Sequence, residues 1–330
     1  MKKSFLLILC LLSGCTTLLP HDPALNRAPI PLTEELVRRS QPPQDSVEFS
    51  MLEKAEWKLY KEYECSVITS SGISLRYNYI QTKTPGKKPL IVIFNILKDP
   101  TMIVSHLLSN YLVTHNYDCV IIRQDFFMDK SFVRPVVTSR GNLLAYDDYN
   151  THLSQNVLRI LRQWMPKQPN LSGEVGFVGV SMGGFHAIGA AALYPEAKIT
   201  VAMMSGASNV DVFKTSEESI VIHNRTNLLA EYIKNYGPSG EDRLYREIDT
   251  VVYNIENLAR AIETSRVRLV ITTEDTSVPT FTQWRLYRLL GGPESLIVPS
   301  GHYTLALYYF SVRSQLVDWL NEAFGRNSED

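Results

Sequence analysis

A serine between two glycines, placed where a predicted strand meets a predicted helix, restricts the fold of this chain more than any other feature. The segment reads Gly179-Val180-Ser181-Met182-Gly183. Apolar residues at 175–180 predict a strand before it, and small residues at 184–193 predict a helix after it. A serine on so sharp a turn requires glycine on both sides, because a Cβ at either position would collide with the neighbouring strand or helix. The pattern therefore predicts a serine hydroxyl raised above the edge of a sheet, with a helix N-terminus behind it.

Short apolar strands and helical segments alternate along most of the chain. Strands are predicted at 90–94, 119–122, 175–180, 200–204, 268–272 and 296–298, and helices at 102–114, 149–164, 184–193, 281–290 and 303–324. Asp147 and Asp148 are the predicted N-caps of the second helix. Two further β-like runs, 62–70 and 73–81, predict a hairpin that leads into the strand at 90–94. This order predicts an α/β fold with a mainly parallel, doubly wound sheet.

A long insertion separates two of these strands. About sixty residues lie between the strands at 200–204 and 268–272, far more than an ordinary connection contains. We expect a helical cap over about 207–265, inserted before the strand at 268–272. Its apolar residues are expected to contact the apolar part of a ligand: Leu228, Leu229, Tyr232 and Tyr236.

The N-terminus has the composition of an export signal. Lys2 and Lys3 precede an apolar run at 5–12 that is too short to span a membrane as a mature helix. The next residues, Leu12-Ser13-Gly14-Cys15, resemble the lipobox of bacterial lipoproteins. The resemblance implies a signal peptide at 1–14 that is cleaved, lipid attachment at Cys15 and a place in the cell envelope, and an ordinary secretory signal is the alternative. Because Thr16 stands where an aspartate often retains lipoproteins at the inner membrane, the periplasmic face of the outer membrane is favoured.

Residues 15–46 are rich in proline and lack a consistent apolar period. This composition predicts a spacer between lipid and domain, part of which lies along the domain surface. The remainder, 47–330, is expected to form one large α/β domain that includes the cap.

Charge and cysteine content restrict the partners and the redox chemistry. The 33 basic residues nearly balance the 34 acidic ones, so no concentrated positive field is available for nucleic acid. Cys65 and Cys119 are the cysteines of the folded body. An oxidising periplasm would permit a disulfide between them, and two buried free thiols are the alternative.

Two later segments supply the groups that activate a serine. A serine hydroxyl needs a histidine base, which a carboxylate orients. Asp275 closes the apolar strand at 268–272, and His302 follows a later strand in a Ser-Gly-His loop. In this order the chain resembles the α/β-hydrolase superfamily over about residues 62–324. The resemblance implies the α/β-hydrolase fold with Ser181 as nucleophile, Asp275 as acid and His302 as base.

Other residues of the same types compete for these roles. Asp211 follows the strand at 200–204 and occupies a position that some relatives use for the acid, whereas Glu274 is expected to point elsewhere. His186 is expected to pack on the helix that follows Ser181, and His223 is expected on the cap surface.

The oxyanion hole is predicted from two backbone N–H groups. One belongs to Met182, the residue after the nucleophile, and the other follows the strand at 90–94. Many relatives have His-Gly-x there, but this chain has Asn95-Ile96-Leu97, so the match to Leu97 lacks the usual glycine. Asn95 either supports this loop through its side chain or caps the turn.

Hydrolysis of a small-molecule ester through an acyl-enzyme is the leading hypothesis. The sequence contains no metal-binding, P-loop or dinucleotide-binding motif, and the chemistry requires no cofactor. One alternative is peptide or amide cleavage, in which an acidic cap residue would hold a substrate amine. The candidates are Glu231, Glu241, Asp242, Glu247 and Asp249. The other alternative is a membrane-tethered binding protein that keeps the fold without catalysis.

Overall fold

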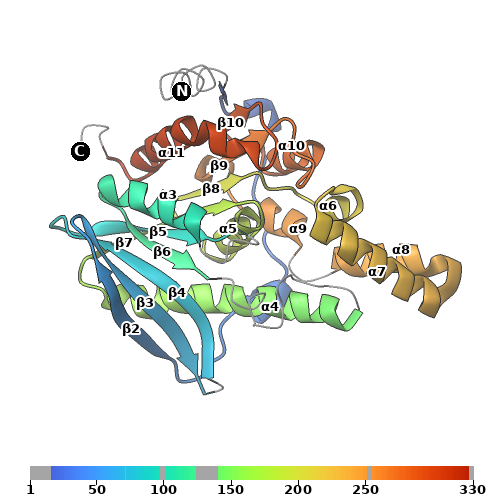
Figure 1. Cartoon of the computed structure of the whole chain (residues 1–330), viewed down its shortest axis with the longest axis horizontal. Helices are drawn as coiled ribbons and strands as arrows, with labels where there is room; N and C mark the ends of the chain where they lie inside the picture. Colours follow the sequence, from blue (N-terminus) through green and yellow to red (C-terminus); the bar gives the residue numbers. More distant parts are fainter. Residues whose placement is uncertain (1–15, 71, 97–101, 124–139, 251–253, 327–330) are drawn as a thin grey trace, which may run out of the picture.

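The computed structural model describes residues 16–70, 72–96, 102–123, 140–250 and 254–326 (Figure 1). Within these ranges, ten strands form one sheet. Their order is β1 (Thr17–Leu19), β10 (Ser295–Val298), β9 (Val267–Thr272), β8 (Ile199–Met203), β7 (Leu171–Val180), β5 (Lys88–Phe94), β6 (Asp118–Ile122), β4 (Gly72–Thr82), β3 (Tyr60–Thr69) and β2 (Glu48–Glu56). The six strands from β10 to β6 are parallel. The mainly parallel sheet predicted from the alternation of strands and helices is confirmed.

Helices cover both faces of the parallel strands. On one face lie α3 (Ile103–Thr114) and α11 (Tyr309–Ala323), and on the other lie α4 (Arg140–Arg159), α5 (Met182–Leu193), α9 (Ile255–Arg260) and α10 (Thr280–Leu289). In strand β5, Leu90, Val92 and Phe94 pack in the core that contains α5. Ile91 and Ile93 pack in the core that contains α3. Because successive side chains of a strand point to opposite faces, an unbroken apolar strand is buried on both sides.

The predicted hairpin is formed by β3 and β4, but it does not join the sheet beside β5. Strand β4 pairs antiparallel with β6, and β6 lies between β4 and β5. The hairpin therefore precedes β5 in the sequence but is not its neighbour in the sheet. The chain leaves β5 through α3 and returns as β6, and β6 lies between β5 and the hairpin.

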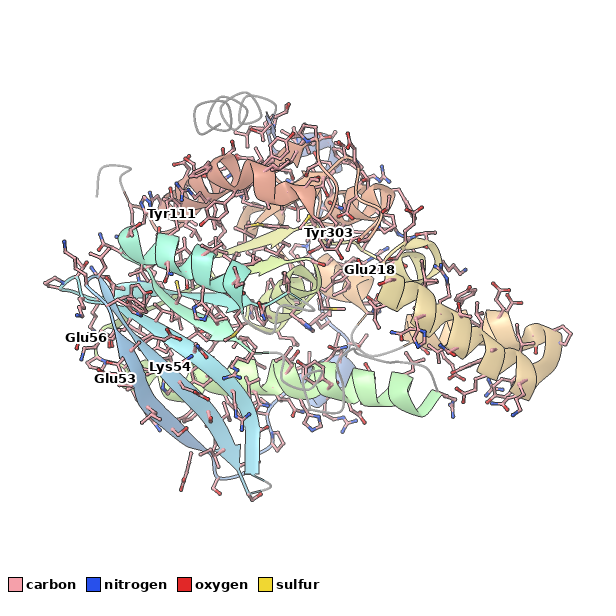
Figure 2. All side chains as sticks on the ribbon, in the orientation of Figure 1. Glu53, Lys54, Glu56, Tyr111, Glu218 and Tyr303 are labelled. Atoms are coloured by element: carbon pink, nitrogen blue, oxygen red, sulfur yellow. The ribbon has the colours of Figure 1, made fainter. Side chains whose placement is uncertain are left out.

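Strand β2, at the edge of the sheet, is not expected from the sequence. Figure 2 shows Glu53, Lys54 and Glu56 along this outer strand. All three form ion pairs. Lys61 pairs with Glu53 at 3.1 Å, Lys83 pairs with Glu56 at 2.6 Å, and Lys54 pairs with Glu62 at 3.5 Å. These charges interrupt the apolar alternation that marks a strand, and they protect an edge strand against pairing with another chain.

Helix α4 begins earlier than the sequence predicts. It starts at Arg140, so Asp147 and Asp148 lie inside the helix and the N-cap assignment is wrong. Both carboxylates instead lie near the guanidinium of Arg39, at 3.5 Å and 3.7 Å. An aspartate that pairs with a distant arginine has the same local sequence signature as one that caps a helix.

The segment interpreted as a spacer packs against the domain. Strand β1 pairs antiparallel with β10, and the Asp22 N–H donates to the Gly292 carbonyl at 2.9 Å. Arg27 donates to the carbonyls of Ala259 and Arg260 at 2.8 Å and 2.6 Å. Farther along, α2 (Glu34–Ser40) contacts α4 and buries Leu36. None of the helices in the described ranges combines the length and apolar character that crossing a bilayer requires.

Cys65 and Cys119 are free thiols, and both are buried. They belong to the two cores on opposite faces of the sheet. A disulfide between them is therefore excluded by the alternation of side chains along β3 and β6. Burial raises the pKa of the Cys65 thiol to about 12, which leaves it unreactive at neutral pH.

The insertion between β8 and β9 is helical, as expected. It contains α6 (Asn209–Thr215), α7 (Ser219–Tyr236), α8 (Gly240–Thr250) and α9. Helices α7 and α8 form a hairpin that projects away from the sheet (Figure 1). Leu228 and Tyr232 of α7 are buried against Leu244 and Ile248 of α8, so the hairpin has a small core of its own.

Candidate active site

Ser181 lies on the sharp turn that the sequence predicts. It follows β7 directly and precedes α5, with φ 55° and ψ −122°. This left-handed region is unfavourable for a residue with a side chain and costs roughly 1–3 kcal/mol. The Ser181 N–H donates to the Met203 carbonyl at 2.8 Å, and the Gly184 N–H donates to the Ser181 carbonyl at 2.9 Å. These bonds hold the strained backbone in place.

The two flanking glycines are required by backbone contacts. A Cβ on Gly179 would lie 2.0 Å from the Gly183 carbonyl oxygen, and one on Gly183 would lie 2.1 Å from the Phe94 carbonyl oxygen. Both distances are far inside van der Waals contact. The steric reason given for the glycines is therefore confirmed, with helix α5 and strand β5 as the colliding neighbours.

Gly183→Ala is expected to lower the free energy of unfolding by roughly 3 kcal/mol, because backbone must move to admit the methyl group. Gly176→Ala, in the same strand as Gly179, is the matched control. Its Cβ would meet only side-chain atoms, the nearest at 3.1 Å. This substitution should therefore lower the free energy of unfolding by less. Urea denaturation of both variants measures the difference. Equal losses of unfolding free energy in the two variants would mean that the close approach of Gly183 to the Phe94 carbonyl does not determine the turn.

His302 and Asp275 meet at the carboxyl edge of the sheet. Nδ1 of His302 lies 2.9 Å from Oδ2 of Asp275, whose side chain is fully buried. Oδ1 accepts from the backbone N–H groups of Ser277 and Val278, both at 2.9 Å, in the turn that follows β9. Oδ2 also accepts from Gln283 Nε2 at 3.1 Å. With these donors the orientation of the carboxylate is fixed, and it can in turn orient the imidazole.

The competing acids lie elsewhere. Asp211 is in the first turn of α6 and accepts from Arg285 at 2.6 Å. Glu274 is exposed, although its N–H donates to the Ser300 carbonyl at 3.0 Å and so joins the acid loop to the base loop. The structure thus brings Asp275, rather than Asp211 or Glu274, to His302.

The other histidines occupy the positions expected of packing and surface residues. His186 is buried on α5 with its ring 6.2 Å from that of Phe94, and burial lowers its pKa to about 4. His223 is exposed on α7, where its Nε2 lies 3.3 Å from the Asn227 amide. Neither lines the cavity that contains Ser181.

Ser181, Met182 and His302 line one cavity of about 560 Å³. This volume lies within the range of small-molecule sites. Its walls are mostly apolar and come from α3, from the 3₁₀ turn η7 (Thr304–Tyr308) and from α11. The main contributors are Val104, Leu107, Leu108, Leu305, Phe310 and Val312.

The cap contributes to this cavity differently from the prediction. Leu228, Leu229, Tyr232 and Tyr236 belong to the core of the α7–α8 hairpin and do not line the cavity. The cap lining comes instead from Val212, Ile220 and Val221, near the start of the insertion. Two paired helices bury their apolar stripes against each other, so these stripes are not available to a ligand.

Only part of the predicted oxyanion hole can be placed. Met182 is the first residue of α5, and the N-terminus of a helix carries partial positive charge. Leu97, the other predicted donor, lies outside the described residues. Oδ1 of buried Asn95 accepts from the Ser105 hydroxyl at 2.7 Å. This bond ties the end of β5 to the start of α3, so Asn95 supports the loop through its side chain.

The sequence did not single out Glu218, which lines the cavity. It precedes α7, and its Oε2 accepts from the hydroxyls of Tyr303 and Ser277. Figure 2 shows Glu218 and Tyr303 on neighbouring elements. Of the acidic cap residues that were considered, none lines the cavity. No local signal distinguishes Glu218 from other cap acids, because only the docking of the cap brings it to the site.

Within the described ranges, no group of three or more histidine, cysteine, aspartate and glutamate side chains could hold a metal ion. The arrangement that the structure does show is a serine, a histidine and a buried carboxylate around an apolar cavity. These groups can carry out acyl transfer by general base and nucleophilic catalysis.

Comparisons with known proteins agree with this architecture. Residues 102–230 match the family model described as alpha/beta hydrolase domain containing 18. The acetyl xylan esterase 1 of Thermoanaerobacterium sp. JW/SL YS485 is similar with a TM-score of 0.64 and 18% identity, over 86% of this chain and 95% of that one. The acetyl xylan esterase of Paenibacillus sp. R4 is similar with a TM-score of 0.61 and 14% identity, over 88% and 97%.

A more distant likeness is to the acylaminoacyl peptidase of Pyrococcus horikoshii, with a TM-score of 0.52 and 14% identity. It covers 84% of this chain and 42% of the peptidase. A comparison with curated protein sequences found no match. Together the structural likenesses show that the chain has the α/β-hydrolase fold.

Proposed function

We propose that this chain is a serine hydrolase that cleaves carboxylic esters through an acyl-enzyme intermediate. One observation carries the proposal. A serine on a strained turn shares an apolar cavity with a histidine that a fully buried carboxylate holds at 2.9 Å. Strained backbone, a buried acid and an adjacent cavity are the features that acyl-transfer sites combine.

In the proposed reaction, His302 removes the proton of Ser181 as its Oγ attacks the ester carbonyl. The Met182 N–H donates to the oxyanion, and His302 then gives the proton to the leaving alcohol. A water molecule, deprotonated by the same histidine, attacks the acyl-enzyme. The carboxylic acid leaves as His302 returns the proton to the Oγ of Ser181. Asp275 holds the ring through Nδ1 and stabilises the imidazolium.

The apolar walls favour a substrate with an acyl chain. Val104, Leu108 and Val312 offer no hydrogen bonds to a sugar or a peptide backbone, whereas methylene groups lose contact with water there. The esterase activity named for two structurally similar proteins supports ester cleavage as the reaction. The identities are too low to transfer a substrate.

Amide cleavage is a second candidate because Glu218 places a carboxylate in the cavity. A carboxylate there could hold a substrate amine, although its Oε2 already accepts two hydrogen bonds. The deciding experiment compares nitrophenyl esters of increasing acyl length with aminoacyl nitroanilides. We expect kcat/KM to rise with acyl length and to be far lower for the amides. Faster turnover of the aminoacyl amides would favour peptidase activity.

We also propose that Cys15 carries lipid and tethers the enzyme to the periplasmic face of the outer membrane. Strand β1 begins at Thr17, which pairs with Ile297 near the carboxyl end of β10. The chain before Thr17 therefore leaves the sheet at the edge that also carries Ser181 and His302. Two residues span at most about 7 Å, so lipid on Cys15 would hold this edge near the bilayer.

The surface around the cavity supports this orientation. Ile103 and Leu107 of α3 are 57% and 50% exposed, and Phe310 of α11 is 53% exposed. Exposed apolar side chains that gather at a cavity mouth are typical of a site that receives an apolar ligand or meets a membrane. A membrane-tethered esterase could take its substrate directly from the lipid phase.

Cys15→Ser is expected to move the protein from the membrane fraction to the soluble periplasmic fraction, because no acyl chain can then be attached. Cys10→Ser, within the predicted signal, is the matched control and should leave the distribution unchanged. Cell fractionation followed by immunoblotting measures both. Membrane association that persists in Cys15→Ser would show that another segment anchors the chain.

A further inference from the structure

The cavity continues away from Ser181 between two helices. Ser105, in the first turn of α3, is bonded to Asn95 beside the nucleophile turn, and α11 follows the loop of His302. Both helices therefore start near the catalytic residues and run away from them. The Tyr309 hydroxyl donates to the Leu107 carbonyl at 3.0 Å and joins the two helices. Val104 lines the cavity, and Tyr111, which contacts Arg313, lies about 10 Å farther along α3 at a rise of 1.5 Å per residue.

Arg313 lines the cavity at the far end of this groove. Its guanidinium lies over the rings of Tyr111, Phe310 and Tyr309, at 4.4 Å, 4.3 Å and 5.1 Å from their centroids. Figure 2 shows Tyr111 on the part of α3 that is remote from Tyr303. Stacking on these rings fixes the plane of the guanidinium and leaves its N–H groups at the edge.

In the described part of the chain, Arg313 forms neither a hydrogen bond nor an ion pair with a carboxylate. Glu218, the acidic residue of the cavity, lies at the opposite end beside Ser277 and Tyr303. The groove therefore has a carboxylate at its catalytic end and a guanidinium at its remote end, with apolar walls between them.

Arg313 shares its neighbour His115 with one basic and one acidic residue, Arg326 and Asp318. Burial lowers the pKa of His115, and the charges of Arg313 and Arg326 lower it further. Asp318, on the exposed side of α11, acts in the opposite direction on the same histidine. Half-buried and surrounded by aromatic rings, a guanidinium interacts with an anion more strongly than it would in water.

We propose that Arg313 binds an anionic group of the substrate, so that the preferred substrates are esters whose chain ends in a carboxylate or a phosphate. The apolar walls would contact the methylene groups between the ester and the anion. A planar guanidinium with free edges binds either anion through two parallel hydrogen bonds. This inference rests on the proposed function, because it requires the ester group to lie at Ser181.

The test compares matched pairs of esters. For an anion on the acyl side, the pair is nitrophenyl octanoate and the nitrophenyl monoester of octanedioic acid. For an anion on the alcohol side, the pair is octyl acetate and the acetate ester of ω-hydroxyoctanoic acid, whose carboxylate is at the end of the chain opposite to the ester. We expect the anionic member of one pair to have the higher kcat/KM. The pair that shows this preference tells whether the acyl or the alcohol part of the ester enters the groove.

Arg313→Met removes the charge and keeps most of the apolar stem. It should lower kcat/KM for the preferred anionic ester by roughly 10- to 100-fold, the effect of losing a charged hydrogen-bond partner, while the neutral ester changes by less than about threefold. Arg285→Met is the control, because Arg285 pairs with Asp211 outside the cavity. Equal losses for both esters would reduce Arg313 to a residue that packs α11 on α3 and would overturn the proposal.

A binding measurement separates this proposal from the proposed function. Octanedioate should bind the Ser181→Ala protein in calorimetry, and Arg313→Met in that background should abolish binding without lowering the melting temperature. Equal kcat/KM for the neutral and the anionic esters would overturn the role of Arg313 and leave the esterase proposal intact. Octanedioate bound through Arg313 by a protein that cleaves no ester would instead contradict the esterase proposal.

Discussion

Ser181→Ala is expected to lower kcat for ester hydrolysis by roughly 10⁴- to 10⁶-fold, because the variant cannot form an acyl-enzyme. The fold should be unaffected. The turn is held by the backbone N–H and carbonyl of Ser181, which alanine retains, and alanine has the same Cβ at φ 55°. The activity that remains would come from substrate binding and the oxyanion donors.

Labelling with a fluorophosphonate probe checks this prediction without a known substrate. The natural chain should be labelled and Ser181→Ala should not. Ser277→Ala is the matched control, since Ser277 lines the same cavity but donates to Glu218 instead of facing a histidine base. Undiminished labelling of Ser181→Ala would assign the reactive hydroxyl to another residue.

Asp275→Asn is expected to lower kcat by roughly 10³- to 10⁴-fold. The backbone N–H groups of Ser277 and Val278 both donate to Oδ1, so the amide oxygen should take this position. The amide NH₂ then faces His302 Nδ1, which must accept rather than donate. This selects the wrong imidazole tautomer and removes the charge that stabilises the imidazolium.

Asp211→Asn provides the comparison and should lower kcat by less than tenfold. Asp211 contributes a partly exposed ion pair with Arg285, and such pairs contribute at most about 1 kcal/mol. Steady-state hydrolysis of one short ester by both variants, with circular dichroism to confirm folding, gives the ranking. A reversed ranking would transfer the acid to Asp211. A small loss in both would indicate Glu274 or a site that works with serine and histidine alone.

Much of the fold could be predicted because the parallel strands are apolar throughout. Strands such as 90–94 and 175–180 are buried on both faces, so their composition alone marks them. The edges of the sheet could not be predicted in this way. Strand β2 is mostly exposed and charged, and β1 lies in a proline-rich segment whose position depends on pairing with β10.

The amino-acid sequence by itself determined the turn that carries Ser181 and the order of the candidate residues. The glycines around Ser181 are a local requirement. Asp275 and His302 each lie in the loop that follows a strand, so short-range patterns identify them. The tertiary structure alone decided that His302 meets Asp275 rather than Asp211, and that the two cysteines lie on opposite faces of the sheet.

The tertiary structure also decided what surrounds the candidate site. Glu218 and Arg313 enter the cavity from segments that are far apart in the chain, while the apolar residues of the cap hairpin are withdrawn into a core of their own. The physical reason is the range of the interactions. Backbone sterics and apolar periodicity act over a few residues and are visible in sequence, whereas side chains that meet across helices depend on how whole elements pack.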